Sequence, residues 1–193
     1  MITHPALDLG SSLHDLAGRS PASDSLIRFA ATNLIYLALI ALAVLWFHRD
    51  GLRAGVAAGA GAGIALAIGA GLGAAWNRPR PFVAHHFTPL FDHAADASFP
   101  SDHLTVLGAI AAACFLAWRL LGVVVSLLAV CVAFGRVAAG IHYVSDVVAG
   151  FALGAAAAIV VWYAIRPLLP VLDQLDTRLR AFRLRRVVLP ARE

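Results

Sequence analysis

Three short clusters contain residue types that a membrane protein rarely keeps for packing alone. They are Arg78-Pro79-Arg80-Pro81-Phe82, Phe99-Pro100-Ser101-Asp102-His103, and Arg136 followed by His142 and Asp146. Guanidinium groups match phosphate oxygens, imidazoles act as nucleophiles or general acids, and carboxylates orient imidazoles. Together the clusters have the groups needed to hold a phosphate, attack its phosphorus and protonate a leaving oxygen.

The third cluster has the most defined spacing. His142 and Asp146 lie four residues apart, so they share a face if the chain is helical there. Asp146 would then accept the proton of one imidazole nitrogen and leave the other free as nucleophile or base. Gly140 suits a turn that brings Arg136 and His142 into one pocket. A structural hydrogen bond and an interfacial arginine stay open as alternatives, and a zinc site lacks a third ligand at a convincing spacing.

The other two clusters are less specific. Pro100-Ser101-Asp102-His103 has the form of a helix start that Ser101 can cap, and the N–H groups of a first helical turn favour an anion. His103 would point into that region as a general acid, with simple capping beside a solvated histidine as the alternative. Arg78 and Arg80 lie on a backbone stiffened by prolines, either as phosphate contacts or in an exposed linker.

The composition indicates an integral membrane protein. Of the 193 residues, 61% are hydrophobic and 13% are charged, whereas soluble domains carry roughly 45–50% apolar and about 25% charged residues. We expect one membrane-embedded domain, 1–168, followed by a basic tail, 169–193. Cys114 and Cys131 lie in apolar runs and act as small hydrophobes. We expect no nucleic-acid partner.

Five apolar segments are long enough, or nearly so, to cross a bilayer as helices, because spanning takes about 20 apolar residues. They are 29–47, 54–76, 104–118, 120–134 and 147–165. The third reaches spanning length if its helix starts near Ser101, and we expect 119–122 to make a tight reversal before the fourth. Gly55, Gly59 and Gly63 favour packing of 54–76 inside the bundle. We expect residues 7–16 to form a short amphipathic helix at the interface.

The arginine distribution predicts the orientation, because cytoplasmic loops carry an excess of positive charge. One side carries Arg49, Arg53, Arg119, Arg166, Arg178, Arg180, Arg183, Arg185, Arg186 and Arg192. The other side carries Arg19, Arg28, Arg78, Arg80 and Arg136. We expect the first side to be cytoplasmic, which places all three clusters and the loop 76–101 on the outer face.

The clusters resemble the motifs of the type 2 phosphatidic acid phosphatase superfamily, which shares its site with vanadium haloperoxidases. That family has a Lys-x6-Arg-Pro motif, a Pro-Ser-Gly-His motif and a Ser-Arg-x5-His-x3-Asp motif. Here the second reads Pro100-Ser101-Asp102-His103, and Gly135-Arg136, His142 and Asp146 keep the spacing of the third in full. Arg-Pro-Arg-Pro-Phe and Ser-Phe-Pro-Ser-Asp-His are typical of the bacterial undecaprenyl-diphosphatase branch.

The resemblance implies an all-α membrane bundle with a vanadium-haloperoxidase-like core, no cofactor and no bound metal. It makes His142 the nucleophile that forms a phosphohistidine, Asp146 its orienting partner, and His103 the group that protonates the leaving oxygen and later helps activate water. The phosphoryl oxygens would be bound by Arg80, Ser101, Arg136 and the main chain around Asp102.

Three positions depart from the family pattern. The lysine of the first motif falls at Gly73, the serine of the third at Gly135, and the glycine of the second at Asp102. Arg78 could replace the lysine from a different backbone position. The loop residues that could shape a headgroup site, with a solvated loop and metal binding as alternatives, are His85, His86, Asp92, His93 and Asp96.

The leading hypothesis is a multi-pass phosphatase of the bacterial plasma membrane. It would hydrolyse undecaprenyl diphosphate to undecaprenyl phosphate and inorganic phosphate at the outer face, which recycles the carrier for cell-wall glycan synthesis. The alternatives are a phosphatase of another lipid phosphate, such as phosphatidylglycerol phosphate or phosphatidic acid, and a non-catalytic lipid-binding or transport protein on the same fold. The sequence does not define the oligomeric state.

Overall fold

Helices make up all the regular structure in the part of the chain that the computed structural model describes, residues 13–45, 47–48, 50–175 and 177–178. The elements are α2 (Pro21–Thr32), α3 (Leu34–Leu45), α4 (Gly51–Trp76), α5 (Pro81–Ala84), α6 (Asp102–Ala117), α7 (Arg119–Ala138), α8 (Val144–Ala164) and the 3₁₀ helix η1 (Arg166–Leu168). Most of the predicted interfacial helix 7–16 and of the tail 169–193 lies outside the described residues. The predicted all-α fold is confirmed.

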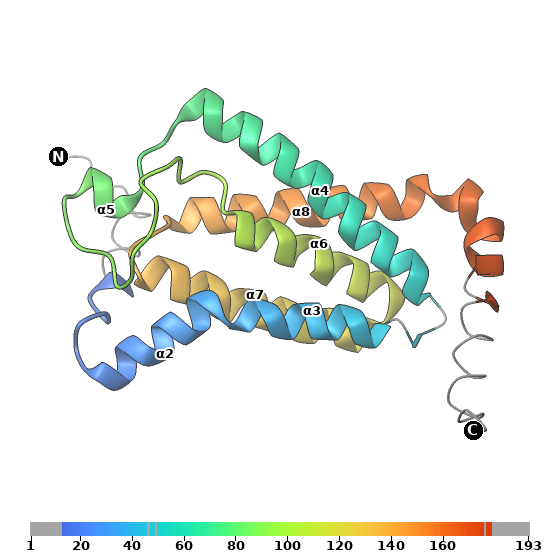
Figure 1. Ribbon diagram of the computed structural model, residues 1–193, viewed down its shortest axis with the longest axis horizontal. Coiled ribbons are helices and arrows are strands. Elements are labelled where there is room, and N and C mark those ends of the chain that lie inside the picture. Colours follow the sequence, from blue (N-terminus) through green and yellow to red (C-terminus); the bar gives the residue numbers. More distant parts are fainter. Residues whose placement is uncertain (1–12, 46, 49, 176, 179–193) are drawn as a thin grey trace, which may run out of the picture.

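Four helical segments of the described chain are long and apolar enough to cross a membrane: Pro21–Leu45, Gly51–Ala84, Arg119–Ala138 and Val144–Ala164. The fifth predicted span corresponds to α6, which begins next to Ser101 as expected and has 16 residues. α6 lies in the middle of the bundle, between α4 and α8 on one side and α3 and α7 on the other (Figure 1). Its neighbours cover it, so it needs less length than a lipid-facing span.

The first span differs from the predicted 29–47. Its helix begins at Pro21, where the Ser20 hydroxyl accepts a hydrogen bond from the Ser23 N–H in a capping box. It is then interrupted at Asn33, between α2 and α3. Hydropathy alone missed the first turns, because they carry polar side chains. Thr32 and Asn33 have side chains that hydrogen-bond locally, which favours such an interruption.

The reversal between α6 and α7 also differs from the prediction. It takes place at Trp118 alone, and 119–122 already forms the first turn of α7. A Cβ atom on Gly122 would collide with the backbone of Phe115. The glycine therefore serves the close approach of the two helices and not the turn.

Small residues set the contact between α6 and α8, which are packed against each other along their length. A Cβ atom on Gly108 would collide with the Phe151 carbonyl, and one on Gly154 would collide with the Thr105 carbonyl. Glycine lets membrane helices approach this closely. The contact fixes the start of α6 beside the start of α8, where the second and third clusters lie.

The predicted glycine stripe of α4 does not face the bundle. A Cβ atom on Gly55, Gly59 or Gly63 would meet nothing within 4 Å. α4 buries its alanine-rich face, including Ala54 and Ala58, and lies at the edge of the bundle. The expectation of an enclosed helix was wrong, because small residues occur on both faces of α4 and give no amphipathic signal.

Candidate active site

All three clusters lie at one end of the bundle (Figure 1). α4 ends at Trp76, where Asn77 adopts a left-handed conformation (φ 45°) that turns the chain away from the helix axis. The following loop, 77–101, passes over the ends of the helices and carries Arg78 and Arg80. α6 and α8 begin at this end and α7 finishes there, so the loop and three helices each contribute to one site.

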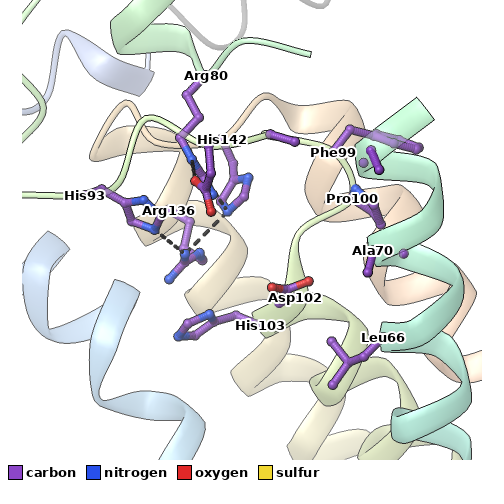
Figure 2. A pocket seen from close by; sticks show the side chains of 15 residues that line it. Leu66, Ala70, Arg80, His93, Phe99, Pro100, Asp102, His103, Arg136 and His142 are labelled. Atoms are coloured by element: carbon purple, nitrogen blue, oxygen red, sulfur yellow. Dashed lines mark hydrogen bonds and ion pairs between the residues drawn. The ribbon is translucent and has the colours of Figure 1, made fainter. Parts of the chain in front are cut away.

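A cavity of about 560 Å³ opens between the loop, α4, α6 and α7. Figure 2 shows polar side chains on one wall and apolar side chains, such as Leu66 and Ala70 of α4, on the other. Five predicted site residues line it: Arg80, Asp102, His103, Arg136 and His142. Such a cavity can hold an anionic group against one wall and an apolar chain against the other.

His142 presents one imidazole nitrogen to the cavity. Its Nδ1 lies 3.0 Å from the Ser98 carbonyl oxygen, which can only accept, so Nδ1 carries the proton. Its Nε2 lies 3.2 Å from Nη1 of Arg80 and 3.3 Å from Nη2 of Arg136. The lone pair of Nε2 is therefore directed at the two guanidinium groups that the sequence predicts as phosphate ligands.

The protonation state of His142 follows from its surroundings. Burial lowers its pKa to about 4, with the attraction of Asp146 opposing the shift and the charges of Arg136 and Arg80 adding to it. The residue as a whole is 3% exposed. At neutral pH it is uncharged, as a nucleophile must be.

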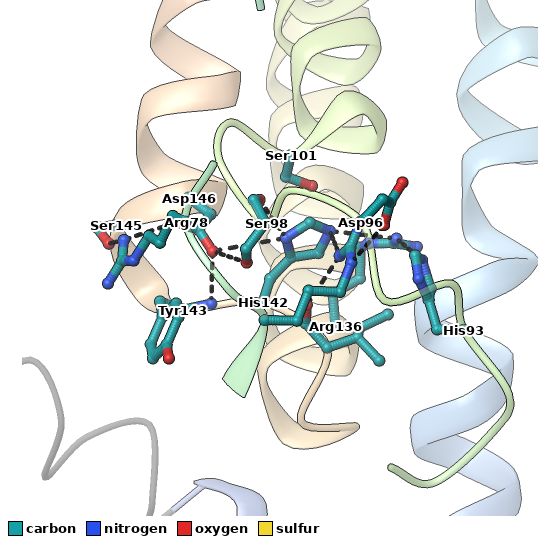
Figure 3. Close-up of polar contacts among 12 residues, drawn as sticks. Arg78, His93, Asp96, Ser98, Ser101, Arg136, His142, Tyr143, Ser145 and Asp146 are labelled. Atoms are coloured by element: carbon teal, nitrogen blue, oxygen red, sulfur yellow. Dashed lines mark hydrogen bonds and ion pairs between the residues drawn. The ribbon is translucent and has the colours of Figure 1, made fainter. Parts of the chain in front are cut away.

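Asp146 does not make the expected direct hydrogen bond to His142. Its Oδ2 lies 3.6 Å from Nδ1, beyond hydrogen-bond length. That oxygen instead accepts from the Ser98 hydroxyl at 2.5 Å and the Tyr143 N–H at 2.9 Å. The carboxylate is fully buried and is connected to the imidazole by hydrogen bonds through Ser98 (Figure 3).

Arg78 is placed differently from the prediction. Its Nη1 donates to Oδ1 of Asp146 at 2.8 Å and to the Ser145 hydroxyl at 2.7 Å. Its guanidinium stacks on the Tyr143 ring, 3.9 Å from the centroid. Arg78 does not line the cavity, and its guanidinium is directed at Asp146 and Ser145 instead.

Arg80 is held from two sides. Its Nε donates to Oδ1 of Asp96 and its Nη1 to the Ile141 carbonyl, at 2.8 and 2.9 Å. Partial burial raises the pKa of Asp96, but the hydrogen bond and charge of Arg80 outweigh it and the pKa is lowered. Arg80 is almost fully buried, so these contacts fix its guanidinium beside His142.

Arg136 is anchored on the interrupted first span. Its Nη1 donates to the Ala31 carbonyl at 3.2 Å, near the junction of α2 and α3. A Cβ atom on Gly135 would lie 2.6 Å from the Ala31 nitrogen. This close contact explains why glycine, and not the serine of the family motif, precedes the arginine.

Two buried donors of the site have no partner in the described chain: the hydroxyl of Ser101 and Nε of Arg136. Ser101 begins α6 without making the predicted side-chain cap. A buried donor without a partner costs about 1–3 kcal/mol. Arg136 lines the cavity, whereas Ser101 is fully buried and lies behind its wall.

The loop histidines differ in their placement. His93 lines the cavity and its Nε2 lies 3.4 Å from Nη2 of Arg136, and burial lowers its pKa. His85 and His86 are exposed and lie outside the cavity wall. Within the described residues no group of three or more His, Cys, Asp or Glu side chains could hold a metal ion.

Sequence reasoning missed the roles of Ser98 and Asp96. Ser98 ties His142 to Asp146, and Asp96 holds Arg80. The only sequence feature that could have identified them is their position in the loop between the first two clusters. That loop belongs to the stretch that resembles the diphosphatase branch. A serine and an aspartate in a polar loop are otherwise typical of turns.

The fold, the motif spacing and the cavity define a membrane phosphatase, and the family model agrees. Residues 54–169 match the model described as the PAP2 superfamily. The chain belongs to this superfamily.

Relatives and a solved structure extend the comparison. The chain is 33% identical to undecaprenyl-diphosphatase BcrC of Bacillus subtilis (strain 168), over 72% of this chain and 74% of that one. It is 34% identical to the putative undecaprenyl-diphosphatase YbjG of Escherichia coli (strain K12), over 86% of both chains. The crystal structure of Aquifex aeolicus LpxE shares the fold, with a TM-score of 0.62 and 22% identity over 82% of this chain and 95% of that one.

Proposed function

We propose that this membrane lipid phosphatase hydrolyses a polyisoprenyl diphosphate, undecaprenyl diphosphate, to the monophosphate and inorganic phosphate. The observation that carries the proposal is the direction of His142 Nε2 toward Arg80 and Arg136, beside the apolar wall of α4. Polar groups on one wall suit the phosphates, and the small side chains of the other leave room for an isoprenoid chain. The names of the relatives BcrC and YbjG support the choice of substrate.

The reaction follows from the placement of two histidines. The Nε2 lone pair of His142 attacks the terminal phosphorus, and the bond to the bridging oxygen breaks as His103 donates its proton to that oxygen. Water then attacks the phosphohistidine, His103 takes the proton from this water, and the phosphorus–nitrogen bond breaks. Inorganic phosphate leaves, and both histidines regain their starting states.

The phosphoryl charge is stabilised by donors in fixed positions. Arg80 and Arg136 provide guanidinium N–H groups, and Ser101 provides its unpaired hydroxyl. The N–H groups at the start of α6, around Asp102, add to them. Such preorganised donors stabilise the charge of a pentacoordinate phosphorus.

A location in the bacterial plasma membrane suits this substrate. The lipid phosphate lies at the bilayer surface, and the site lies at one end of a bundle of membrane-spanning helices. The arginine-poor end carries the site, so we place it on the outer face and the basic tail in the cytoplasm.

Phosphate release by the purified protein tests the substrate. We expect turnover of undecaprenyl diphosphate in the presence of EDTA, faster than that of phosphatidylglycerol phosphate or phosphatidic acid. Faster turnover of either glycerolipid would contradict the assignment of undecaprenyl diphosphate and make that glycerolipid the substrate. A requirement for divalent metal would contradict the mechanism.

A further inference from the structure

The carboxylate of Asp146 is held by several donors, and His142 is not one of them. It is fully buried and receives three short hydrogen bonds, from Arg78, the Ser98 hydroxyl and the Tyr143 N–H. None of these comes from His142, whose Nδ1 bonds to the Ser98 carbonyl. The carboxylate lies beside the imidazole, with Oδ2 3.6 Å from Nδ1, but its hydrogen bonds come from other groups (Figure 3).

A buried carboxylate beside an imidazole creates a problem for a nucleophile. The negative charge favours the protonated imidazole, and an imidazolium has no lone pair for attack. A positive group on the far side of the carboxylate opposes that pull, because its own charge disfavours the imidazolium. Arg78 occupies this place, with Nη1 2.8 Å from Oδ1 of Asp146.

We propose that Arg78 is a positioning residue that compensates the charge of Asp146 and thereby keeps His142 uncharged. Ser98 acts with it: its carbonyl fixes the tautomer of His142 and its hydroxyl holds Oδ2 of Asp146. The inference rests on the proposed function, because it assigns a condition that His142 needs as the nucleophile.

A backbone hydrogen bond connects Arg78 to Ser98. The N–H of Ser98 donates to the Arg78 carbonyl at 2.9 Å, which joins the beginning of the loop to its end. The stacking of Arg78 on Tyr143 directs its guanidinium at Asp146. The arginine therefore reaches Asp146 from outside the cavity and leaves the phosphate position to Arg80 and Arg136.

The other charged groups around His142 either disfavour its protonation or are carboxylates paired with an arginine. Arg80 from the loop and Arg136 from α7 oppose protonation of the imidazole, and Asp146 favours it. The carboxylate of Asp96 is paired with Arg80. The remaining titratable neighbours are His93 of the loop, His103 of α6 and Tyr143 at the start of α8.

The direct test is an NMR titration of ¹⁵N-histidine-labelled protein in detergent, with the His142 signals assigned by their absence in His142→Gln. In the wild type we expect Nδ1 to carry the proton and the pKa to lie well below 6.5. Arg78→Gln should raise the pKa of His142 by about 1 unit, because the charge of Asp146 is no longer compensated. Arg78→Lys should restore much of the original value.

The pH dependence of kcat/KM provides the second readout. Neutral His142 is fully present above its pKa and is lost as the pH falls through it. The activity ratio of wild type to Arg78→Gln should therefore grow as the pH falls from about 8 to about 5. A merely structural loss would lower activity by the same factor at every pH. Arg166→Gln, which removes an arginine stacked on Tyr163 at the other end of the bundle, is the matched control.

Each outcome decides one claim. An unchanged His142 pKa in Arg78→Gln overturns the inference, even if the enzyme hydrolyses the diphosphate. A raised pKa in a protein that hydrolyses no lipid phosphate supports the inference and removes the proposed function. If Arg78→Gln does not fold, Ser98→Ala takes its place, since it removes one donor from Asp146. It should shift the pKa upward, and no shift overturns the inference.

Discussion

At the scale of single residues, two buried donors distinguish the site. The hydroxyl of Ser101 and Nε of Arg136 are buried and have no partner in the described chain. The free protein bears the cost of both, and a phosphoryl group would relieve it. Function and stability therefore oppose each other at these positions.

Ser101→Ala tests this opposition. Removing a donor to the phosphoryl group should lower kcat/KM by about 10²–10³-fold. The thermal unfolding temperature should stay unchanged or rise, because an unsatisfied buried hydroxyl is removed. Ser126→Ala, whose hydroxyl donates to the Gly122 carbonyl within α7, is the control that should keep full activity. A large fall in stability with little change in activity would show that Ser101 is structural.

His103→Gln tests the proton donor. His103 lines the cavity, and removing a general acid typically lowers kcat by about 10²–10⁴-fold. His85→Gln, in the same loop-covered end of the bundle but outside the cavity wall, should keep wild-type turnover. Equal losses in both variants, measured as phosphate release, would contradict the assignment.

Residue types and spacing in the sequence were enough to predict which side chains meet. His142, His103, Arg80 and Arg136 come together as expected. Arg78 was misplaced because its direction depends on the left-handed turn at Asn77 and on the Tyr143 ring. Neither of these is visible in motif spacing.

At the scale of elements, the contact of α6 with α8 determines the site. The start of α6 is joined to α8 by a hydrogen bond from the Ser101 N–H to the Asp146 carbonyl. Gly150 lies against this junction, where a Cβ atom would be 2.5 Å from the Ser101 carbonyl oxygen. The distance between the second and third clusters therefore depends on glycine packing.

Gly154→Ala tests the packing. The added Cβ would collide with the Thr105 carbonyl, and overpacking of this kind costs about 1–3 kcal/mol. Gly63→Ala in α4 adds the same methyl group where nothing lies within 4 Å, so stability should hold or improve. Thermal unfolding in detergent measures both, and equal melting temperatures would contradict the packing account.

Hydropathy located the helices but not their breaks. The interruption at Asn33 and the one-residue reversal at Trp118 depend on local hydrogen bonds and on close packing at Gly122. An average over a window of apolar residues detects neither the local hydrogen bonds nor the contact between the two helices. The interruption matters for function because Arg136 is anchored beside it, at Ala31.

At the scale of the whole molecule, the arginine distribution predicts that the site faces outward and that the basic tail lies in the cytoplasm. Single cysteines in a Cys114→Ala, Cys131→Ala background test it. A membrane-impermeant maleimide should label Ala95→Cys, in the loop over the site, in intact cells. It should label Asp173→Cys, at the other end, only after lysis. The reverse pattern would place the site in the cytoplasm.

The central claim is that His142 carries the phosphoryl group of a lipid substrate. The most direct measurement is phosphate release from undecaprenyl diphosphate, together with trapping of the phosphoenzyme from substrate labelled in its terminal phosphate. We predict turnover by the wild type and an acid-labile label on His142. We also predict a loss on the order of 10⁴–10⁶-fold in a folded His142→Gln variant. Undiminished phosphate release by that variant would contradict the account.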